Sequence, residues 1–232
     1  PDLQMIFQDP ISSLNPRRKV RDVISEGLVI WGDGQGIWSQ GRIDELMHMV
    51  GIDPELGERR VHQFSGGQAQ RIGIARALAL DPKVLICDEP VSALDVSVQA
   101  QILNLLEDMK ERYGLTMLFI SHDLSVVKNV SDRIIVMYLG KACEIGNADL
   151  LYEEPRHPYT RALLASIPQP APTVDVSEGD ISGEIPSPVN PPSGCRFVTR
   201  CPHATSICSS DEPQMQQVGD GDHYVACHHP VE

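Results

Sequence analysis

An alternation of short apolar runs with one long amphipathic segment constrains the fold more than any other feature of the sequence. Residues 84–87 and 115–120 are apolar runs of strand length. Residues 96–113 separate them and carry apolar side chains at helical spacing, namely Val98, Ile102, Leu105, Leu106 and Met109. Two buried strands joined by a crossover helix favour a parallel sheet covered by helices, which is an α/β fold.

The same alternation extends along the first 160 residues. Residues 133–139 and 141–145 predict two further strands of a largely parallel sheet. Residues 69–80 predict a helix, and residues 20–50 predict helices on both sides of a glycine-rich segment at 32–36.

Composition argues against several classes of protein. No stretch approaches the roughly 18 apolar residues of a membrane span, and no charged and apolar leader indicates secretion. The formal net charge of −13 opposes nucleic-acid binding, because neutralising phosphates requires clustered Lys and Arg. Residue 1 is Pro rather than Met, so we expect further coding sequence upstream.

The amino-acid composition changes after residue 167. Prolines are frequent within residues 168–194, which predicts a linker. We expect a main domain over residues 1–150 and a small extension over 151–232. The extension ends in a tail of low apolar content that carries Cys195, Cys201, Cys208 and Cys227.

A serine and two glycines stand directly before the helix predicted at 69–80. In Phe64-Ser65-Gly66-Gly67-Gln68 they present backbone N–H groups at a positive helix end, which suits a phosphate. A serine N-cap with a flexible turn explains the same residues, and both interpretations stay open on this segment alone.

Two carboxylates end the strand predicted at 84–87. Ligands of open α/β sheets bind beyond the carboxyl ends of strands, so one of Asp88 and Glu89 can hold Mg²⁺ while the other orients or deprotonates a water. A solvated strand exit is the alternative. Residues 92–95 form a turn, and His122 follows the strand at 115–120. The order of these motifs makes an independent coincidence implausible.

Taken in order, the motifs resemble those of the ABC transporter ATPase family. Residues 64–68 resemble its signature motif, 84–89 its Walker B strand and 92–95 its D-loop. His122 resembles the switch histidine and Gln8 the Q-loop glutamine. The implied fold is a partial P-loop-type ATPase domain, with a core parallel sheet and a helical subdomain, followed by the cysteine-rich extension.

The resemblance also implies roles for these residues. Glu89 is the general base, His122 contacts the γ-phosphate, and Asp88 and Gln8 serve Mg²⁺. Ser65, Gly66, Gly67 and Gln68 bind the ATP that is held mainly by the opposite subunit. The implied ATP-binding residues also include Gln8, Asp88 and Asp95.

A P-loop string, Gly-x-x-x-x-Gly-Lys-Ser/Thr, does not occur in the 232 residues. The glycines at 32–36 have no accompanying Lys. We expect the P-loop to lie upstream and expect these residues as written to bind ATP poorly. A catalytically silent remnant is the alternative to an active ATPase.

Three longer strings, at 7–16, 157–163 and 191–195, resemble the ATP-binding subunits of oligopeptide, dipeptide and nickel importers. This resemblance implies ATP hydrolysis that energises peptide import, with nickel or another small solute as the alternative cargo. It implies a second ATP-binding subunit, two membrane permeases and an external peptide-binding protein as partners. The expected location is the cytoplasmic face of the membrane. ABC proteins of DNA repair or translation carry a long coiled coil or a second cassette, which this sequence lacks.

The four tail cysteines predict one metal centre, because so small a tail cannot be stabilised by the burial of apolar side chains alone. Their spacing leaves the metal open, and zinc is one candidate, with His203, His223, His228 and His229 as further ligands. Disulfides are less consistent with the missing secretion signal. The family resemblance favours a [4Fe–4S] cluster. Cys87 and Cys143 lie alone in apolar segments and predict buried thiols.

Overall fold

The computed structural model describes residues 1–31, 40–167, 183–219 and 221–231. The chain divides into two compact units, Pro1–His122 and Asp123–Glu232, and each is described by itself.

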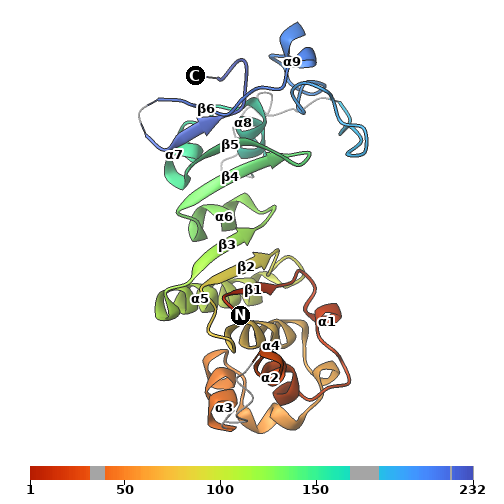
Figure 1. The fold of residues 1–232 in the computed structure, drawn as a ribbon, viewed down its shortest axis with the longest axis vertical. Coiled ribbons are helices and arrows are strands. Elements are labelled where there is room, and N and C mark those ends of the chain that lie inside the picture. Colours follow the sequence, from red (N-terminus) through yellow and green to blue (C-terminus); the bar gives the residue numbers. More distant parts are fainter. Residues whose placement is uncertain (32–39, 168–182, 220, 232) are drawn as a thin grey trace. The chain divides into compact units, whose positions relative to one another are not determined.

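Unit 1 is built on a three-stranded parallel sheet with the order β1-β2-β3 (Figure 1). The strands are β1 (Leu3–Ile6), β2 (Val84–Asp88) and β3 (Thr116–Ile120). Parallel neighbours require a crossover, and α5 (Val96–Tyr113) supplies it between β2 and β3. The helix has the predicted bounds, and Gly114 ends it at φ 60°. These elements confirm the parallel α/β arrangement expected here.

The long connection from β1 to β2 is helical. It contains α1 (Pro10–Ser13), α2 (Val20–Trp31), α3 (Gln40–Met49), the 3₁₀ turns η1 (Pro54–Glu58) and η2 (Val61–Gln63), and α4 (Gly66–Leu78). One hydrophobic cluster joins these helices to α5 and the sheet, with Ile24, Ile72, Leu85 and Ile102 fully buried. The predicted glycine-rich segment at 32–36 lies outside the described residues.

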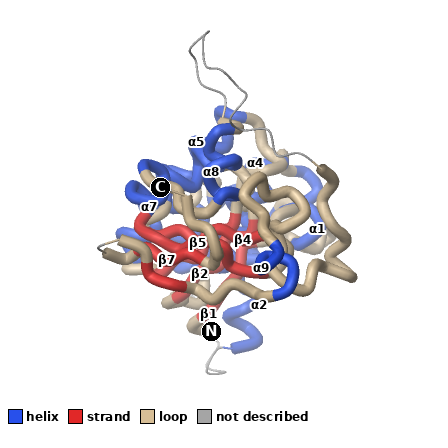
Figure 2. The backbone as a smooth tube through the Cα atoms, turned by 90° about the horizontal axis from the view of Figure 1, so that it is seen from above, coloured by secondary structure: helices blue, strands red, loops and turns tan. Residues whose placement is uncertain are grey.

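Unit 2 contains a four-stranded antiparallel sheet with the order β4-β5-β7-β6. Figure 2 shows β4, β5 and β7 side by side. The strands are β4 (Arg133–Tyr138), β5 (Lys141–Asn147), β6 (Gln216–Gln217) and β7 (His223–Val225). The expectation that 133–139 and 141–145 join a largely parallel sheet is wrong for this pair. Leu139 and Gly140 have φ of 44° and 78°, so they close a tight hairpin, which only antiparallel strands accommodate.

The helices of unit 2 are short: α6 (Leu124–Val130), α7 (Ala148–Glu153), α8 (Pro158–Ala165) and α9 (Ser206–Ser210). The tail adds β6 and β7 to the β4–β5 hairpin, a pairing that the sequence did not predict. It therefore crosses the boundary expected at residue 150. Among the described residues, no helix has the length and apolar character needed to cross a membrane.

Candidate active site and the cysteine-rich tail

Three segments far apart in the sequence meet at one carboxylate of unit 1. Gln8 follows β1, Glu89 follows β2 and His122 follows β3, and parallel strands end at the same sheet edge. The Gln8 amide Nε2 donates to Glu89 Oε2 at 2.7 Å, and His122 Nδ1 lies 3.0 Å from Glu89 Oε1. The structure thus brings together the predicted base, switch histidine and Q-loop glutamine.

The backbone of Glu89 adopts an uncommon conformation, with φ at +43°. The Glu89 N–H donates to the carbonyl of Ile120 at 3.0 Å. The N–H and the hydroxyl of Ser92 both donate to the carbonyl of Glu89, at 3.2 and 3.1 Å. A left-handed conformation costs a residue with a side chain about 1–2 kcal/mol. The role of Ser92 in holding this turn was not predicted, because it depends on a backbone angle that no local pattern reveals.

The environment of Glu89 keeps its carboxylate ionised. The hydrogen bond with His122 is the main cause that lowers its pKa, and bonds from Ser92 and Gln8 act in the same direction. An ionised carboxylate at a sheet edge can accept a proton from water.

Asp88 and Gln8 carry oxygen atoms of the kind that Mg²⁺ binds in proteins. Asp88 lies half-buried at the end of β2, next to the strand that leads to Gln8. Because the Gln8 nitrogen faces Glu89, its amide oxygen remains for a cation. Mg²⁺ prefers such oxygen ligands and keeps several waters.

The Ser65–Gln68 segment caps its own helix. The Ser65 N–H donates to Gln68 Oε1 at 3.1 Å, and the Gln68 N–H donates to Ser65 Oγ at 3.4 Å, which is a capping box. The N-cap interpretation is therefore confirmed. A Cβ added at Gly67 would lie 2.6 Å from Val98 Cγ1, so this glycine also permits the close approach of α5.

Asp95 has the contacts of a helix cap. Its carboxylate accepts from the N–H of Val98 at 3.0 Å and from the Ser97 hydroxyl at 2.7 Å. The bond from Ser97 is the main cause that lowers the pKa of Asp95. Its predicted contact with nucleotide stays a prediction.

The sequence matches two family models. Residues 1–92 match the ABC transporter family, and residues 143–208 match the oligopeptide/dipeptide transporter C-terminal region. The putative oligopeptide transport ATP-binding protein YkfD of Bacillus subtilis is 54% identical, over 97% of this chain and 69% of the relative. OppF of Escherichia coli, an oligopeptide transport ATP-binding protein, is 51% identical over 97% and 68%.

The chain belongs to the oligopeptide transport ATP-binding proteins of the ABC transporter family. A solved structure agrees with the ATPase fold: cbiO1 of Clostridium perfringens, part of the ABC transporter complex cbiONQ. It is 31% identical and superposes with a TM-score of 0.59, over 66% of this chain and 60% of that one.

In this family member, the backbone brings two tail cysteines close together. The Cys195 N–H donates to the carbonyl of Cys208 at 2.8 Å. A Cβ at Gly194 would lie only 2.4 Å from that carbonyl oxygen and 2.9 Å from the carbonyl carbon of Ser209. Only glycine permits this approach of the two segments.

Burial dominates the acidity of the thiols. Burial, together with the neighbouring thiols of Cys195, Cys201 and Cys208, raises the pKa of Cys227 to about 11. Cys87 and Cys143 are buried as predicted, and burial raises the pKa of each to about 12.

The predicted metal centre is not supported by the side-chain positions. Within the described ranges, no three His, Cys, Asp or Glu residues are placed to hold one metal ion. Zinc would need sulfur atoms at about 2.3 Å from a single point. The thiols instead contact neighbours within the tail: Cys227 Sγ accepts from the His229 N–H at 3.4 Å, and Cys208 Sγ lies 3.7 Å from the Thr205 hydroxyl.

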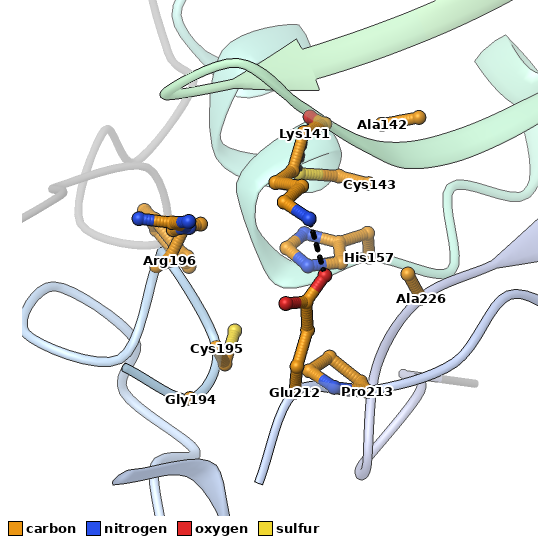
Figure 3. A pocket seen from close by; sticks show the side chains of 11 residues that line it. Lys141, Ala142, Cys143, His157, Gly194, Cys195, Arg196, Glu212, Pro213 and Ala226 are labelled. Atoms are coloured by element: carbon orange, nitrogen blue, oxygen red, sulfur yellow. Dashed lines mark hydrogen bonds and ion pairs between the residues drawn. The ribbon is translucent and has the colours of Figure 1, made fainter. Parts of the chain in front are cut away.

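A small cavity of about 50 Å³ lies beside these cysteines (Figure 3). Cys143 on β5 and His157 at the start of α8 line it, and Cys195 and Arg196 line it from the tail. An ion pair of 2.8 Å between Lys141 and Glu212 crosses it (Figure 3). His157 was expected only as part of the string at 157–163, because nothing in the local sequence indicates its burial.

Proposed function

We propose that the whole protein hydrolyses ATP to energise import of oligopeptides or dipeptides, with Glu89 as the general base. The observation that carries this is the convergence of Gln8 and His122 on the two oxygens of Glu89. An ionised base beside an oxygen ligand set for Mg²⁺ suits attack of water on a phosphoryl group. Nickel or another small solute is the alternative cargo.

The proposed division of labour follows from these positions. Asp88 and the Gln8 oxygen hold Mg²⁺ when ATP is bound, and His122 contacts the γ-phosphate. Ser65, Gly66, Gly67 and Gln68 contact the nucleotide of a second ATP-binding subunit, which requires the capping box to share its donors with phosphate.

The remaining partners are proposed from the family. They are two membrane permeases and, indirectly, an external peptide-binding protein, with this chain at the cytoplasmic face of the membrane. The family membership and the match of residues 143–208 support this assignment. Because the 232 residues contain no P-loop string, the proposal concerns the whole protein.

The test is Glu89→Gln in the whole protein. ATP hydrolysis should fall by a factor on the order of 100 or more, since the proton acceptor is lost. ATP-dependent association of two subunits should persist, since Asp88 is retained. Glu107→Gln is the control, because Glu107 is an exposed acid on α5. Undiminished hydrolysis in the Glu89 variant would sink the assignment, and a wild type without hydrolysis would show a silent remnant.

We also propose that Cys195, Cys201, Cys208 and Cys227 bind a [4Fe–4S] cluster. A cluster separates its thiolates farther than a single ion does, so its ligands need not converge on one point. The backbone contact between Cys195 and Cys208 supports a shared site. Anaerobic reconstitution should give equal iron and acid-labile sulfide, both lost in Cys201→Ser. Stoichiometric zinc in a colourless protein would refute the cluster.

A further inference from the structure

A fully buried carboxylate stands in the middle of the unit 2 sheet. Glu144 on β5 has no exposed surface. An ionised carboxylate in such a place is strongly unfavourable unless several donors satisfy it. Its side chain is therefore expected to organise whatever surrounds it.

Donors from two distant segments meet on this carboxylate. The N–H of Arg156 donates to Oε1 at 2.7 Å, and the N–H of His157 donates to Oε2 at 2.9 Å. From the tail, His223 Nε2 lies 2.7 Å from Oε1, and the two side chains are 3% and 0% exposed. One side chain thus ties β5 to the start of α8 and to β7.

Strand β7 links the Glu144–His223 contact to Cys227, which lies just after the strand. It pairs with β5 over only three residues, so the buried side-chain contact adds to a short ladder. Gly146 makes room for it, since a Cβ there would lie 3.2 Å from the His223 ring. The ladder continues as the Ala226 N–H donates to the Cys143 carbonyl at 2.8 Å, and Cys227 follows.

The other segment held by Glu144, residues 156–157, lies near Cys195 and Cys201. The His157 ring lies 5.9 Å from that of Phe197, which is 1% exposed. Cys195 and Cys201 pack against the same small cluster as Phe197. Figure 3 shows His157 and Cys195 on the same cavity.

We propose that Glu144 is the positioning residue of the cysteine-rich tail: by holding His223 and the 156–157 backbone, it places the thiols for the metal centre. This inference rests on the proposed metal centre for its ligand, but the placement of the thiols is a separate property. Glu144 touches no thiol itself and acts through β7 and through His157.

The first test compares Glu144→Gln with Glu154→Gln in the full-length protein. Gln supplies one acceptor oxygen in place of two, so at least one buried donor loses its partner. Glu154 is the matched control, since its carboxylate is 56% exposed and pairs only at the surface with Arg156. We expect Glu144→Gln to weaken iron uptake roughly tenfold or more, as loss of a supporting residue does at other metal sites, and Glu154→Gln to leave it unchanged.

The second readout needs no metal. In the metal-free protein, alkylation of Cys195 and Cys227, followed by mass spectrometry, should be roughly tenfold faster in Glu144→Gln. Cys87, buried in unit 1, is the internal control and should not change. His223→Gln retains an N–H donor and should behave like wild type, whereas His223→Ala should resemble Glu144→Gln.

The outcomes separate the two proposals. A wild type that binds no iron ends the metal-centre proposal, and the alkylation rates then decide the placement alone. Wild-type alkylation of Cys195 and Cys227 in both Glu144→Gln and His223→Ala overturns the positioning role, whatever metal is bound.

Discussion

The two units of this chain are stabilised in different ways. Among the described residues, unit 1 has one continuous hydrophobic cluster that runs through its sheet and four of its helices. In the described part of unit 2 there are two clusters, with five and three buried side chains. Around them, the Glu144 hydrogen bonds and the glycine contact at Cys208 hold the tail. Unit 1 therefore depends on apolar burial, and unit 2 on a few specific polar and backbone contacts.

The largest expected effect is a core truncation in unit 1. Leu85→Ala removes a fully buried side chain from the central strand and should cost about 4 kcal/mol, through lost burial and a cavity. Leu3→Ala, at a residue that is 56% exposed, should change stability by less than about 0.5 kcal/mol. Hydrogen exchange of β3 and α5 should report the loss, with unit 2 peptides unaffected.

The same chemical change should have opposite signs in the two units. Gly194→Ala places a methyl group against the Cys208 backbone and should destabilise the tail by about 3 kcal/mol, since backbone cannot easily give way. Gly73→Ala in α4 meets no atom within 4 Å and should stabilise unit 1 by about 1 kcal/mol. Denaturant unfolding followed by hydrogen exchange separates the two. Equal effects would contradict the proposed difference between the units.

As the pH falls, the free energy of unfolding of unit 2 should decrease before that of unit 1. Burial lowers the pKa of His157 from 6.5 to about 4, so the unfolded chain binds its proton at a higher pH than the folded chain does. Stability is therefore full above the ordinary pKa and falls as pH drops from about 6.5 toward 4, by about 2 kcal/mol between pH 7 and pH 5. The described histidines of unit 1, His48, His62 and His122, are all exposed.

His157→Asn is the control for this pH effect. Asn can cap α8 as His157 does, through an acceptor that binds the Tyr159 N–H, but it does not titrate. Thermal unfolding of unit 2 should then vary less between pH 7 and pH 5. A slope equal to that of wild type would assign the effect to another group.

The smallest predicted effect isolates the strain at Glu89. Glu89→Gly should be more stable than Glu89→Ala by about 1 kcal/mol, because only glycine adopts φ +43° without cost. At Glu107, inside α5, the order should reverse by about the same amount. Chemical denaturation of the four variants measures both differences.

Periodic patterns and motif order predicted most of unit 1. The helix at 96–113 and the strands at 84–87 and 115–120 follow from burial periodicity, which is a local property. The rule that ligands bind at the carboxyl ends of parallel strands placed Glu89 and His122 at one sheet edge, whereas Gln8 was expected there only from the family resemblance. Neither source could predict the backbone angle of Glu89, because it results from bonds to Ile120 and Ser92.

By itself, the sequence determined the family, the residues at the sheet edge and the burial of Cys87 and Cys143. The tertiary structure decided the antiparallel sheet of unit 2, its two tail strands and the burial of Glu144. The physical reason is that apolar periodicity is a local property, set by neighbouring residues of the sequence. The partners of a buried carboxylate are set by which distant donors reach it, and His223 lies 79 residues from Glu144 in the chain.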